Sequence, residues 1–215
     1  MDLSAIGEQQ ASATSKTLKQ INQLLDYCAT YLDDGIVYQS SDIILTSHSD
    51  AGFNNETKEI SRAGSHIFLS ENEPIPRWNE PILTIKKMMK YVLSSAAESE
   101  MGDLFLTAKE MVPVRHTLNE MGWHQPPSPI QCDKSTAVGM TNSKLVPRKS
   151  KSWDLRLNWL RCRESQNQLR YYWDKGSNNW GDYSTKHHGI IYHETKRSLG
   201  FAGCIYYPKL SEMIC

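Results

Sequence analysis

The stretch IILTSHSDAGF, residues 43–53, decides how the middle of this chain is interpreted. Its apolar and β-branched residues predict a strand, and an acidic residue, Asp50, stands near the end of that strand. A carboxylate inside an apolar strand is costly to bury unless it is paired or binds a metal ion. Asp50 is therefore a candidate functional residue.

The residues on both sides of this stretch predict further strands. Residues 35–39 are β-rich and are joined to it by a Ser-Ser-Asp turn, and residues 63–70 and 75–80 form two more β-rich pieces around a Glu-Asn-Glu-Pro turn. Strands that follow one another this closely favour an antiparallel meander. Apolar residues at helical spacing over residues 17–32 predict a short leading helix.

The second half of the chain alternates between helical and strand-like segments. Residues 94–123 have helical periodicity, open with a serine cap signal and contain Pro113, so we expect two helices that meet near that proline. Five shorter segments follow: a strand over 127–135, a helix over 135–140, an amphipathic helix over 152–166, a strand over 169–176 and an asparagine-capped helix over 178–188. This order predicts an α/β fold in which helices flank a mixed sheet.

Length and composition exclude several classes of protein. The chain has 215 residues, of which 39% are apolar, and no run approaches the roughly 20 apolar residues of a membrane span. We therefore expect no membrane partner. The first 20 residues are polar and lack an apolar signal segment, so an intracellular protein, cytoplasmic or nuclear, is expected. Five cysteines without CxxC spacing argue against a disulfide framework or a zinc ribbon.

A net charge of zero hides one basic segment. Residues 144–170 contain eight basic and two acidic residues, so this segment carries +6 and the remainder of the chain −6. Such clustering is typical of a nucleic-acid contact, but a solvated helix face explains it equally well. The helix within the segment is expected to place its arginines opposite an apolar side formed by Trp153, Leu157, Leu160 and Cys162.

Four acids stand where a side chain would project from a strand or helix toward a common edge: Asp50, Glu100, Asp133 and Asp182. Any one of them could equally be a cap, a turn residue or an ion-pair partner. As a set they would repel one another, and two Mg²⁺ ions about 4 Å apart would neutralise them. Such a pair of ions also clamps the attacking and leaving oxygens of a phosphodiester, so the set favours phosphodiester hydrolysis.

The order of these acids resembles that in the ribonuclease H domain of copia-type long-terminal-repeat retrotransposons. In that family a D-A-x-W or D-A-G-F segment supplies the first acid, matched here by SDAGF at Asp50. A helix opening with Ser-Ser/Thr-Glu-x-Glu supplies the second, and SSAAESE offers Glu98 and Glu100, of which the following apolar residue selects Glu100. Segments C-D-N-x-S-A and A-D-x-x-T-K supply the others, matched by CDKSTA at Asp133 and GDYSTK at Asp182.

This resemblance covers about residues 18–188 and implies a fold, a reaction and a substrate. The implied fold is ribonuclease H-like, a mixed five-stranded sheet whose first three strands are antiparallel, with flanking helices. The implied reaction is hydrolysis of the RNA strand of an RNA:DNA hybrid with two Mg²⁺ ions, Mn²⁺ being the alternative, held by the four acids. A separate reverse transcriptase is a further candidate partner. The expected boundaries are a polar segment and leading helix resembling a polymerase-to-ribonuclease H connector over 1–40, the ribonuclease H-like domain over 41–188 and a tail over 189–215.

The basic segment resembles the family's K-x-x-D-x-R-x-x-x-x-R-E helix, and this resemblance implies scaffold or hybrid contacts for Lys151, Asp154, Arg156, Arg161 and Arg163. The residues expected to contact the hybrid are Lys149, Lys151, Arg156, Arg161, Arg163 and Trp180. This chain departs from the family at two acids, because Lys134 replaces the usual Asn after the third and Gly181 replaces the usual Ala before the fourth. Cellular ribonucleases H often carry a histidine before the last acid, and residues 173–179 contain none.

Other interpretations stay open. A catalytically inactive retroelement remnant would keep the fold as a nucleic-acid-binding or structural module, and a relative with the same fold would cut DNA instead. Residues 31–34, YLDD, spell the reverse transcriptase signature, but only 30 residues precede them, so we interpret them as a turn after the leading helix. His187, His188, His193 and Cys204 fit no usual zinc spacing, and a histidine-rich helix end is expected instead.

Overall fold

The computed structural model describes residues 6–7, 9–30, 32, 35–54, 61–89, 93, 95–142 and 151–186, with the backbone alone for 151–154. The chain divides into two compact units, of which the larger lies within Tyr38–Ile190 and the smaller contains the 3-10 helix η1 (Gln10–Ser12) and the helix α2 (Ser15–Thr30). Helix α2 confirms the leading helix expected from the sequence. Within the described ranges, no helix is long and apolar enough to cross a membrane.

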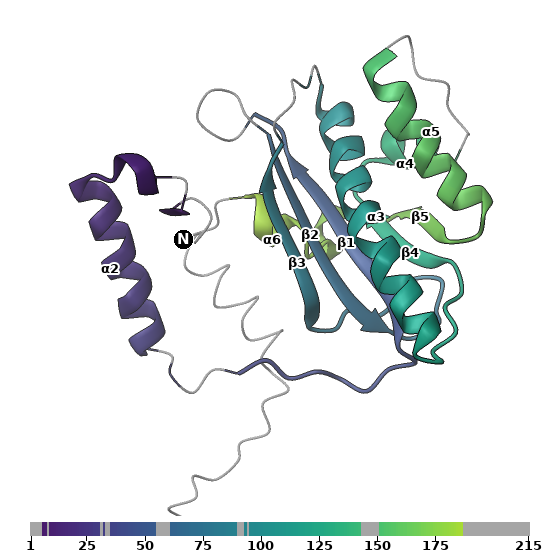
Figure 1. Cartoon of the computed structure of the whole chain (residues 1–215), viewed down its shortest axis with the longest axis horizontal. Coiled ribbons are helices and arrows are strands. Elements are labelled where there is room, and N and C mark those ends of the chain that lie inside the picture. The colour runs from purple at the N-terminus through teal and green to yellow at the C-terminus, as the bar shows by residue number, and fades with distance from the viewer. Residues whose placement is uncertain are drawn as a thin grey trace, which may run out of the picture. The chain divides into compact units, whose positions relative to one another are not determined.

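A five-stranded sheet with the order β3-β2-β1-β4-β5 forms the larger unit (Figure 1). Its strands are β1 (Ile44–Gly52), β2 (Arg62–Ser70), β3 (Pro81–Met88), β4 (Ser128–Cys132) and β5 (Leu169–Trp173). Strand β2 is antiparallel to both β1 and β3, whereas β4 is parallel to both β1 and β5. The predicted mixed five-stranded sheet, with its first three strands antiparallel, is confirmed.

Helices lie against both faces of the sheet (Figure 1). They are α3 (Ala96–Glu120), α4 (Ser135–Thr141) and α5 (Lys151–Ser165) on one face, and α6 (Asp182–Thr185) on the other. Alternation along β1 distinguishes the faces, because Leu45 enters the core under α3 and Ser49 bonds to Asp103 of α3, whereas Asp50 bonds to Thr185 of α6. The core beneath the three longer helices includes Leu45, Ile67, Leu104, Met111, Ile130, Leu157, Leu160 and Leu169, all of them buried.

Two of the predicted strands are wrong. Residues 35–43 and 71–80 contain no strand, and the third strand of the sheet is β3 instead. The extended segments are held by the side chain of Asn79, whose amide bonds to the backbone of Gln39 and Leu69. Strand β3 escaped sequence analysis because it is an edge strand, half-exposed along its length, and therefore lacks apolar alternation.

The predicted break at Pro113 is also wrong, because α3 continues through it as one helix. A proline inside a helix leaves the carbonyl of the residue four positions earlier without its usual partner. That residue is Lys109, which is exposed, so water can satisfy the carbonyl. Leu104, Ala108 and Met111 are fully buried in the core, and this packing on the sheet outweighs the cost of the proline.

Candidate active site

The first candidate acid, Asp50, lies on β1 with 1% of its surface exposed. Thr185 Oγ1 donates a hydrogen bond to its Oδ2, and Lys186 Nζ lies 3.9 Å from its Oδ1. Burial raises the pKa of Asp50; the Thr185 hydrogen bond and the Lys186 charge lower it by less, and Asp182 and Asp133 raise it further. The net effect is a raised pKa, with burial as its largest cause.

The second acid, Glu100, projects from the beginning of α3. Ser95 caps this helix as the sequence predicted, since its hydroxyl accepts a hydrogen bond of 3.2 Å from the backbone N–H of Glu98. Glu98 thus belongs to the half-exposed cap, whereas Glu100 is 2% exposed and faces the site. Burial, followed by the charges of Asp50 and Asp133, raises the pKa of Glu100 from 4.5 to about 9.

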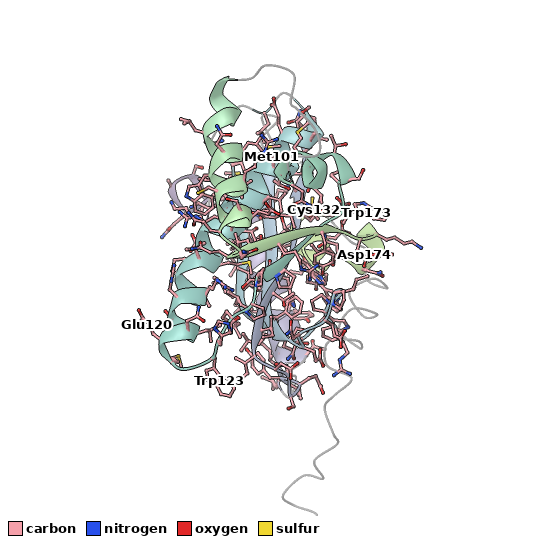
Figure 2. All side chains as sticks on the ribbon, turned by 90° about the vertical axis from the view of Figure 1, so that its right-hand side faces the viewer. Met101, Glu120, Trp123, Cys132, Trp173 and Asp174 are labelled. Carbon is pink, nitrogen blue, oxygen red and sulfur yellow. The ribbon has the colours of Figure 1, made fainter. Side chains whose placement is uncertain are left out.

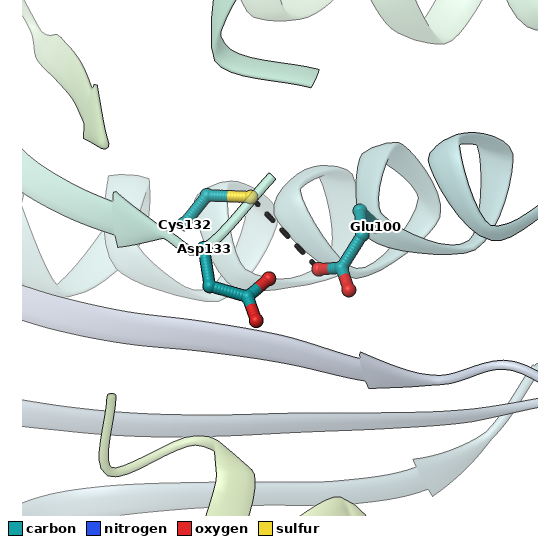
Figure 3. A group of neighbouring side chains, drawn as sticks. All are labelled: Glu100, Cys132 and Asp133. Carbon is teal, nitrogen blue, oxygen red and sulfur yellow. Dashed lines mark hydrogen bonds between the residues drawn. The ribbon is translucent and has the colours of Figure 1, made fainter. Parts of the chain in front are cut away.

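The third acid, Asp133, follows β4 directly. One ligand atom each of Glu100, Cys132 and Asp133 lie within 4.8 Å of one another, and the Cys132 thiol points at Glu100 Oε2 at 3.8 Å (Figure 3). Asp133 Oδ1 is buried and accepts no hydrogen bond from the described residues, although Lys134 Nζ lies 3.8 Å away. A buried carboxylate oxygen without a donor is suited to accept a metal ion.

Neighbouring strand ends fix the backbone of Asp133. Cys132 pairs with Trp173 in the ladder between β4 and β5, and Figure 2 labels both residues at this end of the sheet. Trp173 Nε1 donates a 2.9 Å hydrogen bond to the Asp133 carbonyl oxygen. In addition, a Cβ atom on Gly176 would lie 3.1 Å from Asp133 Oδ2, so the loop after β5 passes close to the carboxylate.

The fourth acid, Asp182, opens α6, which is shorter than predicted and does not use the expected asparagine cap. The side-chain amide of Asn179 is buried. It donates a hydrogen bond of 2.7 Å to the Ser49 carbonyl oxygen and accepts one of 2.9 Å from the Gly181 N–H. A Cβ atom on Gly181 would lie 2.8 Å from the Gly64 carbonyl oxygen and 2.9 Å from the Asp50 nitrogen. A side chain at position 181 would therefore meet backbone atoms of β1 and β2.

The structure therefore brings together charges from four separate segments. The charges of Asp133 and Asp182 raise the pKa of Asp50, and the charges of Asp50 and Asp133 raise the pKa of Glu100. Carboxylate oxygens are the ligands that Mg²⁺ and Mn²⁺ prefer. Burial is the largest cause of the raised pKa values of Asp50 and Glu100, and the charges of the neighbouring acids add to it, so a divalent ion would favour the ionised carboxylates. Asp133 Oδ1 also lacks a hydrogen-bond donor among the described residues. These carboxylate oxygens fit a hard divalent cation.

Sequence analysis missed one buried acid beneath these four. Asp103 has no exposed surface and accepts hydrogen bonds from the hydroxyls of Ser49 and Ser65, the latter also bonded to Thr107. Burial raises its pKa well above the usual range. The three-residue spacing from Glu100 places both acids on one side of α3, but its hydroxyl partners come from distant strands and left no local signal.

Helix α5 presents fewer free cations than predicted. Arg161 Nε donates a hydrogen bond of 2.9 Å to the Met140 carbonyl oxygen of α4. The guanidinium of Arg163 lies 4.8 Å from the centre of the Trp159 ring, within α5 itself. The expected apolar side is partly wrong, because Cys162 is exposed. Arg156 lies 5.7 Å over the Phe105 ring.

Trp180 stands on the opposite face of the sheet from α5. Its ring is 4.5 Å from that of Trp78 and 5.7 Å from that of His66, and its backbone N–H donates to His48 Nδ1 at 3.2 Å. Several predictions lie outside the described residues: those for Lys149, the side chains of Lys151, Trp153 and Asp154, the acids Asp33 and Asp34, and the group His187, His188, His193 and Cys204.

The strand order and directions define a ribonuclease H-like fold, the class implied by the sequence resemblance. In sequence the chain is similar to the retrovirus-related Pol polyprotein from transposon TNT 1-94 of Nicotiana tabacum, with 24% identity over 166 residues. This similarity confirms the predicted resemblance to a retrotransposon polyprotein. It covers 77% of this chain but only 12% of the polyprotein.

No family model matches the chain. Among solved structures, LC11-RNase H1 isolated from compost aligns with a TM-score of 0.49 and 10% identity over 66% of this chain and 93% of that one. The N-terminal RNase H domain of a Mycobacterium tuberculosis protein, fused to maltose-binding protein, aligns with a TM-score of 0.48 and 11% identity over 66% and 91%.

Proposed function

We propose that the chain is a divalent-metal-dependent ribonuclease H that hydrolyses the RNA strand of RNA:DNA hybrids. The observation that carries this proposal is the meeting of Asp50, Glu100, Asp133 and Asp182, with the buried Asp133 Oδ1 left without a hydrogen-bond donor among the described residues. Similarity to a retrotransposon Pol polyprotein supports it, because copying RNA into DNA produces such hybrids.

Each acid has a defined part in this proposal. Asp50, Glu100, Asp133 and Asp182 would hold two Mg²⁺ ions, or Mn²⁺, through their carboxylate oxygens. Bound there, the ions supply an activated water and stabilise the departing 3′ oxygen. Thr185 holds one oxygen of Asp50 in place, and Asn179 fixes the turn that carries Asp182. Asp103 holds β1 and β2 together under the site through Ser49 and Ser65.

The proposed hybrid contacts are phosphate contacts from the basic segment, namely Lys149, Lys151, Arg156, Arg161 and Arg163, together with Trp180. Cations recognise the backbone of a hybrid rather than its bases, so low sequence specificity is expected. An intracellular reverse transcriptase that makes hybrids is the proposed partner.

A cleavage assay on an end-labelled RNA:DNA hybrid tests the proposal. With Mg²⁺ we expect cuts in the RNA strand that leave 5′-phosphate and 3′-hydroxyl ends, and none with a chelator. Glu100→Gln should abolish cleavage, whereas Glu110→Gln, the same change at an exposed position of α3, should not. Binding of hybrid without cleavage would favour the inactive remnant, and preferential cutting of duplex DNA would favour the DNA-cutting relative.

A further inference from the structure

Lys186 follows α6 directly and stands between the first and fourth acids. Its Nζ is hydrogen-bonded to Asp182 Oδ1 and lies 3.9 Å from Asp50 Oδ1. The other oxygen of Asp50, Oδ2, is engaged by the hydroxyl of Thr185. Asp50 Oδ1 thus faces the ammonium group of Lys186.

A divalent ion held between Asp50 and Asp182 by the two oxygens that face Lys186 would occupy the place of its ammonium group. An ammonium and a metal ion repel each other at such distances, so they cannot both be held there without cost. Within the described part of the chain, no lysine is hydrogen-bonded to Asp133 in the way that Lys186 is hydrogen-bonded to Asp182. Lys134 Nζ lies 3.8 Å from Asp133 Oδ1 but is not hydrogen-bonded to it, and that oxygen has no donor among the described residues.

We propose that Lys186 is a tethered counter-ion that competes with metal for the Asp50 and Asp182 oxygens, so the site takes up its two ions unequally. The first ion binds at Glu100 and Asp133, and the second binds only when Lys186 is displaced. This inference rests on the proposed function, because it requires the acids to bind metal.

The charge state of Lys186 is consistent with this role. Burial lowers its pKa, but the hydrogen bond to Asp182 and the charges of Asp50, Asp182 and Asp133 raise it by more, so the ammonium stays charged at neutral pH. Its side chain is 48% exposed and carries a flexible four-carbon stem. Once displaced, the ammonium can turn toward a substrate phosphate, which couples uptake of the second ion to substrate binding.

The test is a Mn²⁺ titration of the full chain without substrate, followed by calorimetry. The wild type should show one tighter and one weaker site, and Lys186→Met should tighten the weaker site roughly tenfold, because one repulsive charge is removed. Lys186→Gln should do the same. Lys109→Met, the same change at an exposed position of α3 nine residues beyond Glu100, should change neither site. Circular dichroism of each metal-free variant checks that it is folded.

Two results would overturn the inference alone: two equal sites in the wild type, or a weaker site that folded Lys186→Met and Lys186→Gln proteins leave unchanged or weaken. A different result would contradict the proposed function, and the inference with it. That result is either no Mn²⁺ binding by the wild type, or Mn²⁺ binding that stays the same in Asp133→Asn.

Discussion

At the scale of single residues, the carboxyl of Glu100 makes the stability of the metal-free protein depend on pH. Its pKa is raised from 4.5 to about 9, so the folded state holds the proton more tightly than the unfolded chain. This contribution to stability is present below the unfolded pKa and is lost as the pH rises through the folded pKa. In a chelator, the free energy of unfolding should therefore fall from about pH 5 to about pH 9.

Glu100→Gln should flatten that decline, because an amide does not titrate. Urea unfolding across the same pH range measures it. A wild-type decline that persists unchanged in Glu100→Gln would assign the effect to another group.

Asp103 is a structural acid whose hydrogen bonds tie α3 to β1 and β2. Asp103→Leu would remove the acceptor of the buried hydroxyls of Ser49 and Ser65, and should destabilise the fold by about 3 kcal/mol. Asp103→Asn keeps the shape, and its amide can accept from one serine hydroxyl and donate to the oxygen of the other, so it should cost less than about 1 kcal/mol. Chemical denaturation of both variants provides the comparison. Equal losses would mean that the negative charge, rather than the hydrogen bonding, is what the site requires.

At the scale of elements, α6 is held against the sheet by the absence of a side chain at Gly181. A Cβ atom there would meet backbone atoms at 2.8 and 2.9 Å, which cannot move aside as a flexible side chain would. Gly181→Ala should therefore push Asp182 away from Asp50 and lower the affinity for Mn²⁺. Gly35→Ala, at a position with nothing within 4 Å, is the control for the glycine-to-alanine change itself. Unchanged Mn²⁺ affinity in Gly181→Ala would show that α6 tolerates the shift.

The helix α3 is continuous although it contains Pro113. Pro113→Ala would restore a hydrogen bond to the Lys109 carbonyl, so it should stabilise the protein by about 1–3 kcal/mol. The midpoint of urea unfolding measures this change. A loss of stability would mean instead that Pro113 relieves strain in the helix.

These elements also show what sequence reasoning can reach. Strands β1, β2 and β4 and helices α2 and α5 follow from local apolar patterns. Strand β3 and the unbroken α3 do not, because an edge strand has no buried face to pattern, and because core packing along α3 outweighs its proline.

At the scale of the whole molecule, the four candidate acids could be selected from sequence because each stands in a short recognisable segment, although Asp50 and Asp182 are 132 positions apart. The residues that support these acids could not be selected from the sequence. Asn179 and Lys186 depend on how α6 meets β1, and that contact has no counterpart in local spacing. The arginines of α5 were predicted as a free basic face, but partner atoms on α4 and within α5 engage two of them.

The measurement that most directly tests the account is anomalous scattering from Mn²⁺ in crystals of the full chain. At a concentration high enough to displace Lys186, the account predicts two peaks within about 2.5 Å of carboxylate oxygens, one at Glu100 and Asp133 and one at Asp50 and Asp182. An absence of peaks at these acids, with Mn²⁺ bound elsewhere or not at all, would contradict it.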